Sequence, residues 1–290
     1  MSASEVAAAQ PVAPPRSGVL RRLMADRAAT LAATLMAVLV GAAVLAPLIA
    51  PYDPYAIDLG KAMRTPDAEH LLGTDATGRD LLSRVLYGMR LTLTMGVSSV
   101  AIGGIIGAAI GVLAAFYRRI DGPVMRLIDM LLAFPAILIG LAAAALFGPG
   151  LAAVIFALIF ATVPDVARIA RGAAVSVAGQ EYLEAGRAVG LSDIVLLWRY
   201  LALNCASTIF VFLTLRFGQV ILIGSALGFL GLGAQPPTAE LGMMAAEGRG
   251  MLFLAPHIVT VPCLFIFLIV LAANVVGDAL RDVLDPRLVA

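Results

Sequence analysis

The charged residues best placed to do chemistry form a short cluster, Asp75, Arg79, Asp80 and Arg84. General acid–base catalysis uses side chains of this kind when they are held against a reacting group. Asp80 and Arg84, however, are four residues apart, which is the spacing of an ordinary ion pair on a helix surface. The cluster therefore favours a structural role, and we expect no catalytic residue in it.

Motifs for nucleotide, metal or covalent chemistry are absent from the sequence. It contains no G-x-x-x-x-G-K-[ST], and the sole lysine, Lys61, lies outside any glycine loop, so the chain cannot build a P-loop. His257 has no second ligand at metal-binding spacing. Cys205 and Cys263 lie in separate apolar runs, as packed thiols do. We therefore expect a chain without a catalytic residue, a metal site or a cofactor.

Three charged residues fall within or near long apolar segments: Asp129, Asp165 and Arg216. A charge left in lipid costs roughly 2.5 to 3.5 kcal/mol on insertion scales, so each is a functional candidate by default. Asp129 and Asp165 are expected near the ends of their segments, where water and Arg126 or Arg168 are available. Arg216 lies about halfway along its segment, where it would line a polar path or pair across a subunit interface.

Composition places these residues in a membrane protein. Of the 290 residues, 61% are hydrophobic and 13% are charged, whereas soluble domains carry about a quarter charged residues. The apolar residues form uncharged runs long enough to cross ~30 Å of hydrocarbon at ~1.5 Å per helical residue. Lys and Arg number 20 against 19 Asp and Glu. This balance leaves no net field to attract nucleic acid.

Six apolar segments are predicted to cross the membrane as helices, which gives an all-α membrane fold. A tail at 1–27 precedes them and a charged tail at 278–290 closes the chain. The second segment carries glycines at four-residue spacing on one face, where another backbone can pack closely. The segments are 28–50, 91–117, two helices within 130–164 divided at Gly148-Pro149-Gly150, about 200–233 and about 251–277, and the glycines are Gly103, Gly107 and Gly111.

The polar segment 51–90 is too long to be a turn. Its last part reads as a capped amphipathic helix with a stripe of leucine and valine side chains, and we expect this helix to lie along the membrane face. Arginine placement sets the orientation: thirteen arginines lie in the segments that would be cytoplasmic if the N-terminus is inside, and the opposite segments hold six basic residues. We therefore expect both termini in the cytoplasm and 51–90 outside. The stripe consists of Leu81, Leu82, Val85 and Leu86.

The polar segment 168–199 reads as two helices joined by a tight corner. Gly190 suits the left-handed position that closes the first helix, and Ser192 can cap the next, with Asp193 in its first turn. Small residues on one side would let the corner fit a groove on a soluble partner, and a surface hairpin without a partner is an equal interpretation on spacing alone. These small residues are Ala185, Gly186 and Ala188.

Glu184-Ala185-Gly186, followed after three residues by Gly190, resembles the EAA loop of binding-protein-dependent ABC importer permeases, which forms the coupling helix that docks on the ATPase. Two further segments, 70–90 and 228–288, narrow the resemblance to the dipeptide, oligopeptide and nickel type, and the first of them marks the second permease of a pair. The resemblance spans nearly the whole chain. Three positions depart from the family's usual residues: Gly186 stands for Ala, Leu203 for Pro and Gly224 for Glu.

The resemblance implies a type I ABC importer permease fold, the MetI-like fold, with its core at 91–277, in a bacterial inner membrane. It also implies partners: a homologous second permease, two cytoplasmic ATPase subunits that hydrolyse the ATP, an extracytoplasmic solute-binding protein, and membrane lipid. The solute would be a peptide, or nickel or another small solute. A secondary transporter or channel driven by an ion gradient is the alternative, and it would show inverted repeats or midplane charges, of which we find only Arg216.

Overall fold

The computed structural model describes residues 26–284 of the chain. Residues 1–25 of the expected N-terminal tail and 285–290 of the expected C-terminal tail lie outside the described residues. Within the described part the regular elements are helices, and the only β-type pairing there is one isolated bridge between Thr74 and Asp80. The predicted all-α fold is therefore confirmed.

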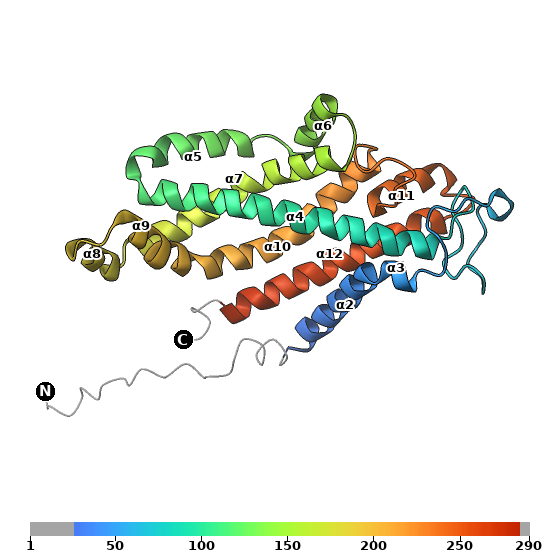
Figure 1. Cartoon of the computed structure of the whole chain (residues 1–290), viewed down its shortest axis with the longest axis horizontal. Coiled ribbons are helices and arrows are strands. Elements are labelled where there is room, and N and C mark those ends of the chain that lie inside the picture. Colours follow the sequence, from blue (N-terminus) through green and yellow to red (C-terminus); the bar gives the residue numbers. More distant parts are fainter. Residues whose placement is uncertain (1–25, 285–290) are drawn as a thin grey trace, which may run out of the picture.

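Five helices are long and apolar enough to cross a membrane, and a bent pair of helices brings the number to six. Figure 1 shows the longer helices lying side by side along the length of the molecule, with α2 against α12. The six predicted segments are thus present when the bent pair counts as one. The long helices are α2 (Arg27–Val44), α4 (Leu81–Phe116), α7 (Leu151–Ala178), α10 (Leu203–Phe229) and α12 (His257–Leu284), and the bent pair is α5 (Arg118–Leu132) with α6 (Ala136–Phe147).

Short elements occupy the two ends of the bundle. The short elements that connect α2 to α4 and α10 to α12 lie at one end of the bundle (Figure 1). The short elements that connect α7 to α10 lie at the other end. The first group is α3 (Ala46–Ile49), η1 (Leu59–Lys61), α11 (Leu241–Gly248) and η3 (Arg249–Met251), and the second is α8 (Glu181–Ala188), α9 (Asp193–Val195) and η2 (Leu196–Ala202), which has π-helical geometry.

The glycines of α4 pack against α7. A Cβ atom on Gly107 would lie 2.6 Å from the carbonyl oxygen of Val163, and one on Gly111 would lie 2.3 Å from that of Ala167. Only glycine permits backbones to approach this closely. The prediction of a close-packing face is confirmed, and the backbone that it meets belongs to the same chain.

The predicted amphipathic helix along the membrane face is wrong. Asp80 caps α4, accepting a hydrogen bond from the Ser83 backbone N–H, and the helix then continues through the membrane for 36 residues without a break. Leu81 and Val85 are buried against core residues of α11 and α12. The apolar stripe therefore faces protein, because α4 continues through Gly88 into the spanning segment and no proline interrupts it.

The third predicted span also differs from the structure. The apolar run continues from Met130 onward, but α5 ends at Leu132 and α6 begins at Ala136, with an angle of 86° between them. Pro135 stands at the break as the N-cap of α6. A proline disfavours helical geometry in the residue before it and cannot donate a backbone hydrogen bond. The bend therefore has a local cause that the apolar composition concealed.

Candidate coupling and translocation site

The corner after α8 has the geometry that its sequence predicts. Gly190 adopts φ +83°, in the left-handed region. Its N–H donates to the Arg187 carbonyl at 3.0 Å, and the Leu191 N–H donates to the Gly186 carbonyl at 3.1 Å. This pair of hydrogen bonds is the Schellman motif, which satisfies the last carbonyls of a helix. Ser192 stands at the N-cap position of α9, but its side chain makes no capping hydrogen bond.

The small residues of α8 do not share one face, which corrects the predicted small-residue side. Gly186 is buried, and a Cβ atom there would lie 2.9 Å from Leu196 Cδ2, so this glycine packs α8 against η2. Glu184 and Ala185 are exposed. The residues available to a partner are therefore Glu184, Ala185 and the Gly190 turn, while Gly186 allows the two arms of the corner to approach each other.

Large apolar side chains surround this exposed face, and the sequence reasoning missed them. Val189 is 82% exposed, Ile194 72% and Trp198 68%. Apolar side chains gathered on an exposed polar segment mark a protein or membrane contact. The signal was present in the sequence as Val189 and the apolar run 194–198, within the segment 168–199 that also carries charges.

The corner is tied firmly to the bundle. Leu183, on the inner face of α8, belongs to one buried cluster with Val112 of α4 and Leu201 of η2. On its other side, η2 runs directly into α10 without an intervening turn. Close-packed side chains and a continuous helix, rather than a flexible linker, therefore connect the corner to α4 and α10.

Arg216 has partners within this chain. Its guanidinium lies 2.7 Å from Asp165 Oδ2, donates to Gln219 Oε1 at 2.7 Å and donates to the Ala161 carbonyl at 3.2 Å. The Arg216 side chain is 12% exposed. Asp165 lies within α7, which continues past Pro164 to Ala178, so the carboxylate is 13 residues before the end of this helix.

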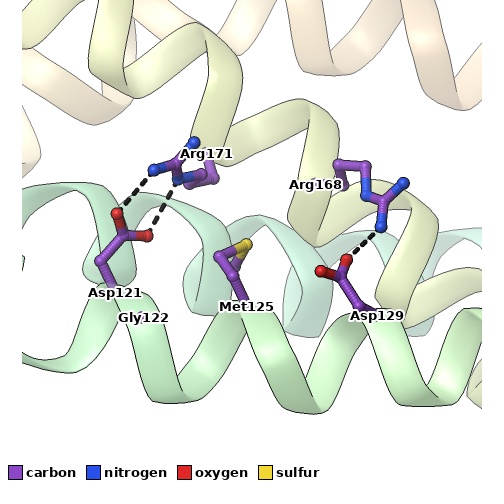
Figure 2. Close-up of a pocket in the computed structure, with 6 residues that line it drawn as sticks. All are labelled: Asp121, Gly122, Met125, Asp129, Arg168 and Arg171. Carbon is purple, nitrogen blue, oxygen red and sulfur yellow. Dashed lines mark hydrogen bonds and ion pairs between the residues drawn. The ribbon is translucent and has the colours of Figure 1, made fainter.

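Two further ion pairs join α5 to α7. Arg171 donates two hydrogen bonds of 2.9 and 2.6 Å to Asp121. Asp129 pairs with Arg168, which is one of the two arginines expected beside this carboxylate. Figure 2 shows the four side chains facing one another across a pocket, with Met125 between the pairs. The pocket has a volume of about 360 Å³. These pairs hold the first arm of the bent segment against α7.

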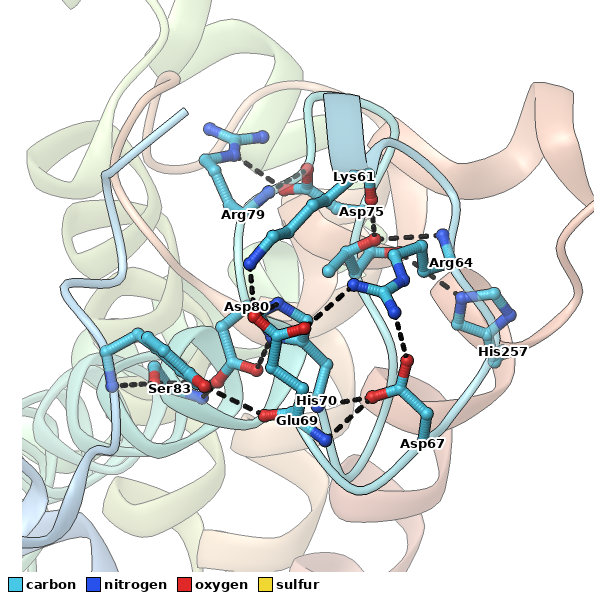
Figure 3. A network of polar contacts seen from close by, with 12 residues as sticks. Lys61, Arg64, Asp67, Glu69, His70, Asp75, Arg79, Asp80, Ser83 and His257 are labelled. Atoms are coloured by element: carbon cyan, nitrogen blue, oxygen red, sulfur yellow. Dashed lines mark hydrogen bonds and ion pairs between the residues drawn. The ribbon is translucent and has the colours of Figure 1, made fainter. Parts of the chain in front are cut away.

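At the opposite end, the 51–80 segment is folded by a polar network (Figure 3). On its surface Arg64 contacts Asp67 at 2.9 Å and Glu69 at 3.0 Å, and Lys61 pairs with Glu69. Below them the buried His70 Nδ1 lies 2.9 Å from Asp80 Oδ1. Asp80 therefore pairs with histidine, and the surface pair predicted between Asp80 and Arg84 is wrong.

Arg84 is instead fully buried and joins this segment to α11. It lies 3.3 Å from Asp75 and 2.9 Å from Glu247, and Arg79 lies 2.5 Å from Asp75. Burial raises the pKa of Asp75, but hydrogen bonds from Thr77 and the charge of Arg79 outweigh it and hold the pKa below its ordinary value. This carboxylate is consequently ionised and serves as the counter-ion of two guanidinium groups.

Glu240 is a further buried carboxylate, which the sequence reasoning did not single out. It is 1% exposed, caps α11 by accepting from the N–H groups of Gly242 and Met243 at 2.9 Å, and accepts from Thr92 Oγ1 of α4 at 3.1 Å. A Cβ atom on Gly228 would lie 2.3 Å from its Oε2. Burial raises the pKa of Glu240 against the lowering effect of these hydrogen bonds.

Comparison with known proteins agrees with this geometry. A protein named as the glutathione transport system permease GsiD of Pectobacterium atrosepticum is 42% identical over 82% of this chain and 80% of its own length. A Brucella suis protein bearing the name of a peptide transport system permease is 43% identical over 81% and 79%. The inward-facing MetNI methionine ABC transporter superposes with a TM-score of 0.57 at 19% identity, covering 69% of this chain and 96% of that one, which shows the same fold.

Family descriptions match two parts of the chain. Residues 15–66 match the N-terminal transmembrane domain of oligopeptide transport permease C. Residues 107–290, which contain the corner, the bent segment and Arg216, match the binding-protein-dependent transport system inner membrane component. With most of its length in that match and relatives above 40% identity, the chain belongs to the family of binding-protein-dependent inner-membrane permeases of ABC importers.

Proposed function

We propose that this permease works beside a homologous second permease, takes its energy from two cytoplasmic ATPase subunits, and receives peptides from an extracytoplasmic solute-binding protein. The observation that carries the proposal is the exposed corner at 184–198. It presents Ala185, Val189 and Trp198 to the outside of the bundle while Leu183 anchors it in the core. A rigid, apolar projection on the end of a membrane bundle fits a soluble subunit that pushes on it.

Peptide is the substrate class that the relatives support best. The names of two relatives refer to glutathione, itself a peptide, and to peptides. Nickel is less well supported, because within residues 26–284 no group of three or more His, Cys, Asp or Glu side chains is arranged to hold a metal ion. A gradient-driven transporter would use a midplane charge free to change partner, and Arg216 is instead neutralised by Asp165 within the chain.

The proposed orientation places the corner in the cytoplasm and 51–80 outside, with both termini in the cytoplasm. The arginine distribution supports it. Reporter domains inserted near Ala178 and fused after Ala290 should report cytoplasm, and one near Ala68 should report the opposite side. The same side for the 178 and 68 insertions would overturn the orientation.

The test of coupling introduces a charge at the corner and at a matched exposed position. Val189→Glu is compared with Leu59→Glu, since these side chains are 82% and 72% exposed at opposite ends of the bundle. The permease is co-expressed with the proposed partner permease and ATPase subunits. Val189→Glu should reduce ATPase recovery and substrate-stimulated ATP hydrolysis, because a carboxylate is costly to bury in an apolar contact.

Leu59→Glu should leave ATPase recovery at the wild-type level. Normal recovery and hydrolysis with Val189→Glu would show that the corner is not the contact. A complementary measurement concerns the isolated permease, which should hydrolyse no ATP because its sequence contains no P-loop.

A further inference from the structure

A basic cavity lies beside the corner, between the α4–α5 turn and α8. It has a volume of about 370 Å³ and is lined by Phe116, Tyr117, Arg118, Arg119 and Arg187. Figure 1 shows α8 at the same end of the molecule as the turn from α4 into α5. Three guanidinium groups from two segments, almost 70 positions apart in the sequence, thus line one opening.

These guanidinium groups lack carboxylate partners, unlike other arginines at this end of the molecule. Within residues 26–284 no Asp or Glu lies within 4.0 Å of Arg118, Arg119 or Arg187, whereas Arg168 and Arg171 each pair with an aspartate. Arg187 rests over the Phe116 ring, 5.7 Å from its centroid, which fixes its position without neutralising it. The cavity therefore holds about three uncompensated positive charges.

The position of two of these arginines strengthens the requirement for an anion. Arg118 and Arg119 form the first residues of α5, whose N-cap residue Tyr117 makes no side-chain capping hydrogen bond. Positive charges at a helix N-terminus oppose the helix dipole. An anion in the cavity would offset the guanidinium groups and would add to the effect of Asp121, the acidic residue in the first turn of α5, which is itself paired with Arg171.

The depth of the cavity indicates where that anion comes from. No charged residue occurs from Leu91 to Tyr117, a run of ~40 Å at ~1.5 Å per helical residue, which exceeds the ~30 Å hydrocarbon thickness. The arginines begin immediately after it, at the level of the lipid headgroups. Exposed apolar side chains flank them, Leu113 at 37% and Ile120 at 43%, and Tyr117 is a typical interfacial residue.

We propose that this cavity binds the anionic headgroup of a phospholipid of the cytoplasmic leaflet, with the phosphate against the arginines and an acyl chain along Leu113 and Ile120. The proposal relies on the proposed orientation, which places this end of the bundle at the cytoplasmic leaflet. Arginine is suited to phosphate because its planar guanidinium donates two parallel hydrogen bonds. Since Arg187 belongs to α8, the bound lipid would connect the corner to the α4–α5 turn.

The test measures lipid retention by the complete importer. The complex is purified with its partner subunits into nanodiscs of phosphatidylcholine mixed with phosphatidylglycerol, and the retained phosphatidylglycerol is quantified by mass spectrometry. The double variant Arg118→Gln/Arg119→Gln is compared with Arg126→Gln/Arg281→Gln. Arg126 and Arg281 are exposed arginines of α5 and α12 that line no part of the cavity, so both variants remove the same charge.

Each arginine near an anionic lipid surface contributes about fivefold to binding, so Arg118→Gln/Arg119→Gln should lower phosphatidylglycerol retention by roughly 25-fold. The matched variant should leave it unchanged. Equal losses in the two variants would overturn the proposal, because they would reflect overall charge. Thermal stability of both complexes checks that the variants are folded.

Two further measurements distinguish a bound phospholipid from a free anion and from a protein contact. Inorganic phosphate added in excess should not displace phosphatidylglycerol, and full displacement would assign the cavity to a free anion instead. Loss of the ATPase subunits at unchanged lipid retention would assign the arginines to a protein contact and overturn the lipid proposal. Because retention is measured whether or not ATP hydrolysis is coupled, failure here is distinct from failure of the proposed coupling.

Discussion

Replacing Gly190 tests whether the left-handed corner itself is what the ATPase recognises. Gly190 has φ +83°, and a Cβ atom added to it would meet nothing within 4 Å. The cost of a side chain is therefore a backbone cost rather than a clash. It amounts to roughly 1 to 2 kcal/mol for an ordinary L-residue, and more for a β-branched one.

That cost can be converted into a loss of docking. If the corner opens when undocked, a penalty of 1 to 2 kcal/mol lowers the docking equilibrium roughly 5- to 30-fold. Asparagine visits the left-handed region more readily than other non-glycine residues. We therefore expect ATPase affinity to fall in the order Gly190, Asn, Ala, Val.

The assay is ATPase binding and substrate-stimulated ATP hydrolysis by the importer in nanodiscs. Gly179→Ala is the matched control: it lies in the same segment, has φ −82°, and its added Cβ atom would make only ordinary contacts at 3.9 Å. An order that follows side-chain volume, with Asn worse than Ala, would refute the backbone argument and indicate steric exclusion by the ATPase. Equal effects at Gly179 and Gly190 would refute it as well.

Three other substitutions test the remaining contacts. Gly186→Ala should be tolerated, with a loss of roughly 1 kcal/mol in thermal unfolding, because the 2.9 Å contact is with the flexible end of Leu196. Arg216→Leu should reduce uptake more than complex recovery if the guanidinium lines the pathway, and Asp165→Asn should reproduce the defect if only the ion pair matters. Asp75→Asn should destabilise the permease, by less than the roughly 3 to 5 kcal/mol of a wholly unpaired buried charge, since Arg79 and Arg84 are left sharing Glu247 as their remaining counter-ion. Because folding lowers the pKa of Asp75, this carboxylate contributes stability to the wild-type protein that is fully present above its ordinary pKa of 3.8. That contribution is lost as the pH falls through the lower pKa of the folded state. The Asn variant should lack this acid-dependent loss of stability.

The spans could be predicted because uncharged runs of this length have no stable alternative to a helix in lipid. Their breaks were harder to predict. A bend of 86° at Pro135 lies inside a continuous apolar run, and composition gives no sign of it. The opposite error occurred at Leu81, where a polar flank suggested a separate helix although α4 continues through Gly88 without a break. The position of a proline carries this information, and apolar composition does not.

The corner was partly predictable for a different reason. Gly190 is a local signal, because a left-handed residue closing a helix strongly favours glycine whatever surrounds it. The burial of Gly186 was not predictable, because it depends on how closely η2 folds back on α8 and brings Leu196 against it. Helix-capping residues therefore predict where the chain turns. The packing of α8 against η2 decides which residues of the corner face a partner.

For the charged groups too, the sequence predicts that a partner is needed but not which residue supplies it. Sequence spacing suggested that Arg84 pairs with Asp80, but Arg84 contacts Glu247, 163 residues away. A mid-membrane charge such as Arg216 must have a partner, and this requirement is predictable from solvation alone. The identity of the partner depends on the rotation and depth of a second helix, which here places Asp165 of α7 at 2.7 Å. The requirement nevertheless limits the choice: an arginine halfway along a span needs acceptors within reach of its guanidinium. Arg216 and Asp165 together therefore constrain how α7 and α10 pack.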